Sequence, residues 1–479
     1  PGDKDQIVQV PKGTGMSNAG EQLQGFLNQL PEKELKILAA KIELDRGENR
    51  FGIPHDAIMA LLRPRLAEMR APRIFTPQRV LCLPFEDMLI FKDPDPKQPG
   101  KIARAAIGPM WNLLMDRVKP KWDPIADAFI AAQKKGDETT KNQTASALWA
   151  LAAQTLKEWD TELGTDAGEI RAAAKKIGGT KRLEDLREMM AILAIADIVE
   201  SLKEKLPRKP ILNFTPEHVT IVKRHYDMVG DQAADHEVYL LLALMGRLLQ
   251  PFPILKVFRA LSRKLDDTLT SSTDLGIAGN IVIEALERDA DAVAEAADAP
   301  NATETDVIAK AKRFSLAFKG ITADIGIRRD GDWGKRMYGC RGKVSHAIEN
   351  LVLSNAQDVI LNMLPNKGKG IPDFSDFPDE AKFEMAERRA RALGEASRMA
   401  EQIGLQSACQ SKVNQLRKDL EQYAAKIIEK LPKVGPDNKP EASAHLATTV
   451  RLVELITNSD TADLLRRRGN AALTGKTLN

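Results

Sequence analysis

The sequence predicts an all-α protein, in which multi-helix bundles or a helical-repeat-like array are joined by Pro/Gly-rich linkers. Apolar residues recur at helical spacing from Glu21 onward, whereas the alternation typical of β-strands is nearly absent. The apolar residues are mainly Ala and Leu, and aromatic residues make up only 5% of the chain, which favours closely packed helices over β-sandwiches. Proline- and glycine-rich stretches separate the periodic segments.

The bulk composition is that of a globular protein without strong overall charge. Of the 479 residues, 43% are apolar and 29% are charged, which excludes an intrinsically disordered chain. The net charge is only +3, so attraction to nucleic acid or to a membrane surface would have to be local. Three widely spaced cysteines, Cys82, Cys340 and Cys409, argue against a disulfide framework and fit a reducing compartment.

We find no segment that is expected to target the chain or to span a membrane. The first twenty residues lack a basic region followed by an apolar core, so they predict no secretory signal. The most apolar run is VYLLLALMGRLL, which is too short to cross a bilayer and contains Arg247. We therefore expect a cytoplasmic protein without a membrane span.

The first part of the chain predicts a tail and a helical domain. Residues 1–19 are polar and Gly-rich and predict a mobile tail. Residues 20–207 predict an N-terminal helical domain, in which the prolines near residues 84–124 indicate an irregular insertion with one or two short helices. Apolar spacing then predicts helices over residues 140–161 and 181–206.

Residues 208–364 predict a middle helical domain. Its first helix begins at Pro216, with Thr215 as N-cap. The form Phe-Thr-Pro begins at both Phe75 and Phe214, but Thr-Pro is an ordinary helix start, so we favour coincidence over an internal repeat. The later elements are helices over residues 236–249, 252–265 and 275–298, a helix that follows the capping-box pattern NATE at 301–304 and ends near Lys319, a basic loop over 320–343, and a helix over 344–363.

The last part of the chain predicts a linker, a bundle and a tail. The linker covers residues 365–379, and the C-terminal helical bundle covers residues 380–468. The apolar residues of one bundle helix recur at spacings of four and three, which predicts a seam for antiparallel packing: Cys409, Val413, Leu416, Leu420, Tyr423 and Ile427. Residues 469–479 predict a tail, with Gly469 as the C-cap of the last helix.

Residues 217–237 contain three of the six histidines and offer a set of possible metal ligands. His218 and His225 are seven residues apart and share a helix face, and Asp235 and His236 follow on the next segment. Their spacing matches no common metal site, so polar helix faces and a cap are the favoured interpretation. We therefore predict no metal and no cofactor, and keep these four residues as the candidates for a metal site.

The most unusual stretch is RRDGDWGKRMYGCRGKVSH, residues 328–346, which we interpret as a loop that binds an anion or a protein partner. Glycines allow close backbone approach, Arg and Lys contact phosphate, and Trp or Tyr offers a stacking face. The candidate residues are Arg328, Arg329, Trp333, Lys335, Arg336, Tyr338, Arg341 and Lys343. Cys340 lies among these cations, so its thiol pKa should be lowered if the side chain is exposed.

Charge of opposite sign is segregated around this stretch. Residues 308–343 contain ten basic and three acidic residues, whereas residues 284–306 contain eight acidic and one basic residue. The two segments either neutralise one another, within the chain or between copies, or the basic one binds an external anion. A plain solvated connector is the third interpretation, and neutralisation is the one we favour.

The sequence indicates an intracellular helical scaffold, adaptor or assembly subunit that acts through protein–protein interaction or self-association. The alternative is a nucleic-acid or anionic-ligand binder that uses residues 328–343. A third hypothesis is a metal-dependent hydrolase centred on residues 218–237. No residue set indicates a reaction class, which favours a protein that is not an enzyme.

Overall fold

The predicted all-α class is confirmed, because helices make up nearly all of the regular structure that is described. The computed structural model describes residues 25–27, 29–45, 58–59, 61–62, 65–66, 69, 75–91, 93–261, 275–457 and 459–474. The predicted tail over residues 1–19 lies outside them. The chain divides into unit 1, residues 1–77 and 130–137, and unit 2, residues 78–129 and 138–479.

Helix α2 (Glu32–Asp45) organises the core of unit 1. Leu35, Ala39 and Ile42 recur at intervals of four and three residues, so they share one helix face and are buried together. The other buried members of this core are Leu27, Met59 and Leu62. The described core of unit 1 is therefore small.

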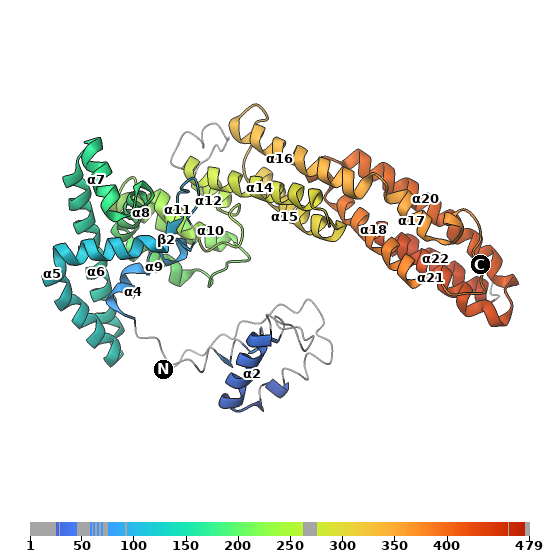
Figure 1. Ribbon diagram of the computed structural model, residues 1–479, viewed down its shortest axis with the longest axis horizontal. Coiled ribbons are helices and arrows are strands. Elements are labelled where there is room, and N and C mark those ends of the chain that lie inside the picture. The colour runs from blue at the N-terminus through green and yellow to red at the C-terminus, as the bar shows by residue number, and fades with distance from the viewer. Residues whose placement is uncertain are drawn as a thin grey trace. The chain divides into compact units, whose positions relative to one another are not determined.

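Short elements and one parallel strand pair precede the long helices of unit 2 (Figure 1). Leu89 in β1 pairs with Ile102 in β2. In chain order the elements are α4 (Pro77–Cys82), η1 (Glu86–Met88), β1 (Leu89–Ile90), β2 (Ile102–Ala103), η2 (Arg104–Ala106), α5 (Ile107–Lys135), α6 (Glu138–Leu163), α7 (Ala167–Ile177), α8 (Thr180–Ala194), α9 (Ala196–Lys205), α10 (Pro216–Gln232), α11 (Glu237–Met245) and α12 (Ile254–Leu261).

Helix α5 corrects the prediction of an irregular segment near residues 84–124, because it begins at Ile107 and runs through Pro120 and Pro124. An interior proline removes a backbone hydrogen bond and clashes with the carbonyl four residues earlier. The helix nevertheless has a buried face on both sides of these prolines, formed by Leu114, Val118, Trp122, Ala126 and Phe129. Packing of this face therefore outweighs the local preference of proline.

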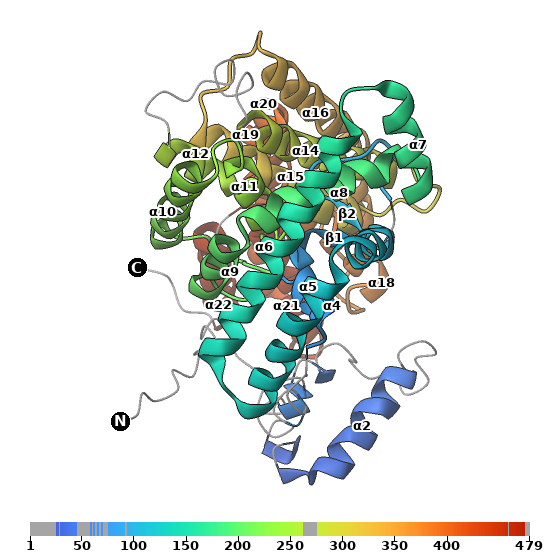
Figure 2. The same ribbon diagram turned by 90° about the vertical axis from the view of Figure 1, so that its left-hand side faces the viewer.

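Helices α6 and α8 pack side by side (Figure 2). The predicted helix over residues 140–161 corresponds to α6, whereas the one predicted over 181–206 is divided at Ile195 into α8 and α9. Trp149 on α6 is buried and donates its indole N–H to the backbone oxygen of Val80 (2.9 Å). This bond links the start of unit 2 to its central helices.

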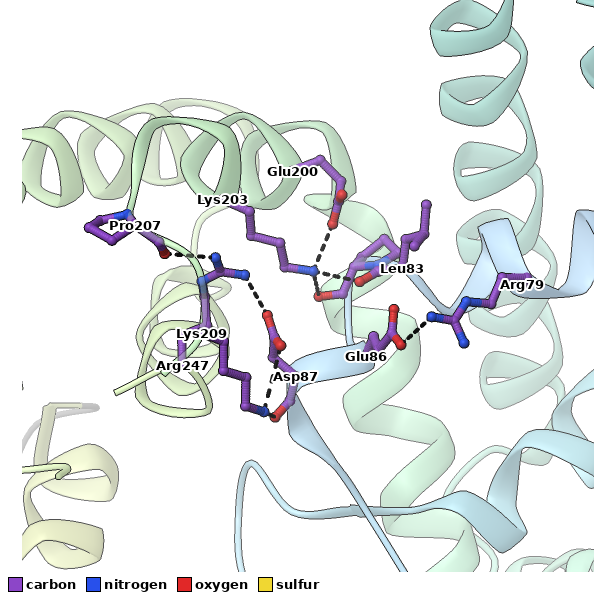
Figure 3. A network of polar contacts seen from close by, with 10 residues as sticks. Arg79, Leu83, Glu86, Asp87, Glu200, Lys203, Pro207, Lys209 and Arg247 are labelled. Atoms are coloured by element: carbon purple, nitrogen blue, oxygen red, sulfur yellow. Dashed lines mark hydrogen bonds and ion pairs between the residues drawn. The ribbon is translucent and has the colours of Figure 1, made fainter. Parts of the chain in front are cut away.

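A polar network holds the turn between α4 and β1 against α9 and the end of α11 (Figure 3). Lys203 on α9 donates to the backbone oxygen of Leu83 (2.5 Å). Asp87 accepts from Arg247 (2.7 Å), and the Nζ of Lys209 lies 3.6 Å from the other Asp87 oxygen. Backbone oxygens and charged carboxylates are costly to bury without hydrogen-bond partners. Lys203 and Arg247 donate such bonds to Leu83 and Asp87 here.

The remainder of unit 2 contains helices that pack on one another in several groups (Figure 1). Helix α14 packs against α15 and α16, and α18 packs against α15, α17, α20 and α21. The elements are α14 (Leu275–Asp298), α15 (Glu304–Asp324), α16 (Asp332–Ile348), the π-helix η3 (Glu349–Leu353), α17 (Ala356–Met363), η4 (Pro365–Gly368), α18 (Glu380–Arg398), α19 (Ala400–Ile403), α20 (Gln406–Lys430), η5 (Leu431–Lys433), η6 (Pro436–Asn438), α21 (Lys439–Ile456) and α22 (Ser459–Thr474).

The prediction of a loop over residues 320–343 is wrong for most of its length, because α15 continues to Asp324 and α16 begins at Asp332. The N-cap of α15 is Thr303, two residues after the position that the NATE pattern indicated. The glycines of α16 lower its helix propensity, but one side of the helix is buried at spacings of four and three: Trp333, Met337, Cys340, Val344 and Ala347. Tertiary packing stabilises this helix.

The C-terminal helices confirm the predicted seam and correct the predicted end. All six predicted seam residues of α20 are buried. Gly469, predicted as a C-cap, lies inside α22, and a Cβ at this position would lie 2.2 Å from the Leu446 side chain. The glycine therefore permits close packing of α21 and α22. The described part of the predicted tail, residues 469–474, is helical.

The segment predicted as a linker, residues 365–379, is hydrogen-bonded to the C-terminal helices. Tyr423 on α20 donates to the backbone oxygen of Pro365 (3.3 Å), and Lys426 donates to that of Lys369 (2.7 Å). These bonds attach the first part of the segment to α20. Among the described residues, no helix combines the length and the apolar character that crossing a bilayer requires.

Candidate functional site

Trp333, which we expected to stack on a ligand, is part of the core between α16 and α14. Its side chain is 1% exposed, and its indole N–H donates to Asn280 Oδ1 (2.7 Å). The ring occupies the space that a side chain at Gly279 would fill, since a Cβ there would lie 2.2 Å from Trp333 Cη2. Trp333 therefore cannot stack on an external base.

Two of the predicted cations on the same side of α16 pair with the acidic helix α14. Arg336 donates from Nε to Glu287 Oε1 and from Nη2 to Glu287 Oε2, and each distance is 2.8 Å. Lys343 lies 2.8 Å from Asp291. These bonds join the basic segment to the acidic one within the chain, so a large part of the segregated charge is balanced without an external ligand.

A second side of α16 holds an arginine–aromatic cluster. The guanidinium carbon of Arg329 lies 5.1 Å from the centre of the Tyr338 ring, and that of Arg341 lies 5.9 Å from the rings of Tyr338 and Phe318. Cations at this distance are attracted by the aromatic face. Within the described parts of the chain, neither arginine has a carboxylate partner.

The two remaining candidates lie on the surface. Arg328 pairs with Asp330 (3.0 Å) in the turn before α16. Lys335 is exposed, and no carboxylate of the described residues forms an ion pair with it. The eight predicted residues therefore do not form one binding surface, and of the cations among them only Arg329, Lys335 and Arg341 form no ion pair with a carboxylate of the described residues.

Cys340 is buried, and burial raises the pKa of its thiol to about 11. The condition under which we expected a lowered pKa is therefore not met, because the side chain faces α14 rather than the solvent. Glu287 and Asp291 raise the pKa further, whereas Lys343 and Arg336 lower it. Cys82 and Cys409 are also buried, and burial raises the pKa of each thiol to about 11.

The four metal candidates have separate structural roles. His218 closes a capping box with Thr215: its Nδ1 accepts from the Thr215 backbone N–H (3.1 Å). The ring of His225 is buried, and its Nδ1 lies 2.7 Å from the backbone oxygen of Ile221. Asp235 adopts φ +71°, and His236 Nδ1 lies 3.2 Å from the backbone oxygen of Ala234.

No group of three or more His, Cys, Asp or Glu residues in the described part of the chain is close enough to hold a metal ion. His218 and His225 are seven residues apart and share a helix face. Nδ1 of His218 is bonded to the backbone, and the two ring nitrogens of His225 contact the backbone and a neighbouring side chain. The described residues therefore give the hydrolase hypothesis no metal site.

A cleft of about 550 Å³ lies between residues 365–379 and the helices α17, α18, α20 and α21. His445 in its wall is 4% exposed, and burial lowers the pKa of this side chain. Its Nε2 lies 3.0 Å from the backbone oxygen of Asp376, and Tyr423 is hydrogen-bonded to Pro365. Tyr423 and His445 therefore use these polar atoms to hold residues 365–379 in place.

A second hollow, a groove of about 450 Å³, lies between α15 and α18. Ile308 and Ala392 form its apolar base, with the exposed Ala309 beside them. Charged side chains of both signs line its rims: Lys312, Glu384, Glu387, Arg388, Arg391 and Glu395. A groove with an apolar base and charged rims suits an amphipathic helix.

The two helices that form the groove run in the same direction. Glu304 pairs with Arg389 (2.7 Å) at one end, and Lys312 pairs with Glu395 (3.0 Å) further along. Leu316 lies one turn after Lys312 on α15, and Met385 lies two turns before Ala392 on α18, so each is in line with a lining residue of the groove. Both side chains are exposed.

Sequence reasoning missed this groove. The residues Thr305, Ala309, Lys312 and Leu316 recur at spacings of four, three and four, which a surface face of any helix can show. The pairing of α15 with α18 depends on α16 and α17, which run back between them. The sequence predicted a loop for most of α16, so it gave no sign of this pairing. No protein-family model, curated protein or solved structure matches this chain.

Proposed function

We propose that this chain is a cytoplasmic helical interaction protein, a scaffold, adaptor or assembly subunit, which binds an amphipathic helix of a partner protein in the α15–α18 groove. The observation that carries the proposal is the groove with its apolar base and charged rims, together with the exposed Leu316 and Met385 in line with its lining residues. Exposed apolar surface that is bordered by polar groups is typical of interaction sites.

The dimensions of the groove define its occupant. From Thr305 to Leu316 the helix axis rises about 16 Å, which equals three helical turns. A partner helix of that length would bring apolar residues at positions i, i+4, i+7 and i+11 onto Ile308, Ala392 and the two exposed apolar residues. Backbone groups on both sides are already satisfied within their helices, so side chains would supply the recognition.

The charges of the rim add specificity. Lys312 pairs with Glu395, and Arg391 pairs with Glu387 (2.8 Å), so these groups are balanced within the chain. Glu384 and Arg388 lie one turn apart on α18, and neither has an ion-pair partner among the described residues. The complementary helix would therefore carry a basic residue opposite Glu384 and an acidic residue opposite Arg388.

The test begins with capture of partners on the full chain and identification of what remains after a high-salt wash. The identified protein is then produced separately, and its affinity is measured by calorimetry for the wild type and for Leu316→Glu/Met385→Glu. We expect at least about tenfold weaker binding by this variant, because charge at both positions opposes burial of an apolar stripe. Leu212→Glu/Leu464→Glu is the matched control, since both leucines are exposed and lie outside the groove.

Equal affinities for the wild type and the groove variant would refute the groove as the binding site, and so would an equal loss in the control variant. If only further copies of the chain are captured, sedimentation must show an assembly that the groove variant, but not the control, disrupts. Capture of nucleic acid alone would refute the interaction proposal.

A second candidate, binding of nucleic acid or another anion, is favoured by Arg329, Lys335 and Arg341, whose charges have no carboxylate partner in the described structure. This binding would weaken steeply with salt. It would also be reduced by Arg329→Glu/Arg341→Glu more than by charge reversal of Lys121, an exposed residue on α5. Filter binding with a short single-stranded oligonucleotide measures both effects.

A further inference from the structure

A second cavity in unit 2, of about 220 Å³, collects positive charge over an apolar wall. It lies where the turn at residues 99–101 meets residues 242–251 and helix α14, and it is separate from the α15–α18 groove. Its apolar wall includes Leu242, Met245, Leu248 and Ile281. The charged residues in its lining are Lys101, Arg288, Arg313 and Asp289.

The cations of this cavity exceed its carboxylates. Arg313 lies 2.6 Å from Asp289, so these two charges balance one another. Lys101 and Arg288 have no ion-pair partner in the part of the chain that is described. Burial lowers the pKa of Lys101, and the charges of Arg288 and Lys209 lower it further. The lining therefore holds two positive charges that no carboxylate of the described residues pairs with.

Neighbouring carboxylates do not remove this excess, because other cations already use them. The backbone N–H of Gly100 donates to Glu188 (3.3 Å), and the Glu188 carboxylate lies 3.1 Å from Lys97. Asp87 accepts from Arg247 and lies near Lys209. These two carboxylates therefore already have cationic partners.

We propose that this cavity binds a small organic anion in which a phosphate monoester is joined to a short apolar chain. Lys101 and Arg288 would contact the phosphate, whose double negative charge matches two unpaired cations. The chain would lie along Leu242 and Ile281. Because a phosphate balances two charges and a carboxylate only one, the site discriminates between these groups.

The test is calorimetry on the full chain at low ionic strength, with hexyl phosphate, inorganic phosphate and hexanoate as probes. Each methylene that is buried should strengthen binding about fourfold. We therefore expect hexyl phosphate to bind at least about tenfold more tightly than inorganic phosphate, and hexanoate to bind more weakly than hexyl phosphate. No detectable binding of hexyl phosphate, or equal affinity for all three probes, would overturn the proposal.

Two variants locate the site. Arg288 is exposed, so Arg288→Glu should leave the fold intact, and Lys101→Met keeps an apolar side chain of similar length. We expect each to weaken hexyl phosphate binding by at least about tenfold. Lys121→Glu, a charge reversal of an exposed residue outside the cavity, should change the affinity by less than about twofold. Equal losses in Arg288→Glu and Lys121→Glu would assign the binding to general surface charge.

The variants also separate this inference from the proposed function. Binding of hexyl phosphate does not involve Leu316 or Met385, so it should be unchanged in the groove variant. Urea unfolding of each variant checks that a lost affinity is not a lost fold. A wild-type affinity for hexyl phosphate in Arg288→Glu and Lys101→Met would refute the site even if the partner-binding experiment succeeds.

Discussion

Two glycines on neighbouring helices show that the same residue type has opposite effects at different positions. Gly279 on α14 leaves room for the Trp333 ring, and its missing Cβ would lie 2.2 Å from Trp333 Cη2. Gly339 on α16 has nothing within 4 Å of the corresponding position. Both lie inside helices, where alanine is intrinsically favoured over glycine by about 1 kcal/mol.

We expect Gly279→Ala to lower the free energy of unfolding by about 1–3 kcal/mol, because a buried indole must shift to accept the methyl group. Gly339→Ala should raise it by about 0.5–1 kcal/mol, because only helix propensity changes. Urea unfolding midpoints measure both. If Gly279→Ala instead stabilises the protein, the position of the Trp333 ring does not require a glycine at residue 279.

A buried carboxylate on α8 makes stability depend on pH. Burial raises the pKa of Glu188 to about 7, although Lys97 at 3.1 Å opposes this shift. In the unfolded chain the pKa returns to its ordinary value near 4.5. Between these two values the folded state retains a proton that the unfolded state has lost, so stability falls as pH rises from about 4.5 to 7 and then levels off.

We expect this carboxyl group to account for a loss of up to about 3 kcal/mol across that interval. Glu188→Gln cannot titrate, so the difference in unfolding free energy between variant and wild type should change over the same pH interval. Urea unfolding at a series of pH values from 4 to 8 on both proteins measures this difference. A difference that is constant with pH would contradict the raised pKa.

At the scale of the element, α16 shows why a helix can be missed in the sequence. Its glycines and its clustered charges are typical of a loop, and they outweighed the helical spacing of its apolar residues in the prediction. The side chains that stabilise α16 come from α14, about fifty residues earlier, through Trp333–Asn280 and Arg336–Glu287. By contrast, the seam of α20 was predictable because its apolar spacing runs through a segment that contains no glycine or proline.

The pairs between α14 and α16 should differ in strength. Arg336 and Glu287 form a bidentate pair with side chains 27% and 33% exposed, whereas Lys343 and Asp291 form a single contact with side chains 57% and 51% exposed. A double-mutant cycle with alanine should give a coupling energy of about 1 kcal/mol for the first pair and less than about 0.5 kcal/mol for the second. Equal couplings would show that the bidentate geometry adds nothing.

At the scale of the whole molecule, the small net charge conceals two strongly charged segments. Arg313, Arg336 and Lys343 of the basic segment pair with Asp289, Glu287 and Asp291 of the acidic one. The sequence predicted the segregation, and it left open whether balance arises within the chain or between copies. These pairs join α14 to both of its neighbours, α15 and α16, so balance within the chain accounts for part of the segregated charge.

The two units should unfold separately, because their cores differ in size. The described core of unit 1 has six buried side chains, and a small core supplies little stabilisation. All five tryptophans, Trp111, Trp122, Trp149, Trp159 and Trp333, belong to unit 2, so fluorescence reports unit 2 alone while circular dichroism reports both units. We expect urea to produce an early change in circular dichroism that fluorescence does not follow.

Two buried leucines test this independence. Leu35 on α2 is 0% exposed and Leu286 on α14 is 1% exposed, and replacing such a leucine with alanine costs about 2–5 kcal/mol. Leu35→Ala should shift only the early transition seen by circular dichroism, because the cavity that the substitution leaves lies in the core of unit 1. Leu286→Ala should shift the fluorescence transition to lower urea and leave the early one in place. If either substitution displaces both transitions equally, the units unfold together, and the core of unit 1 is then stabilised by more than its own six side chains.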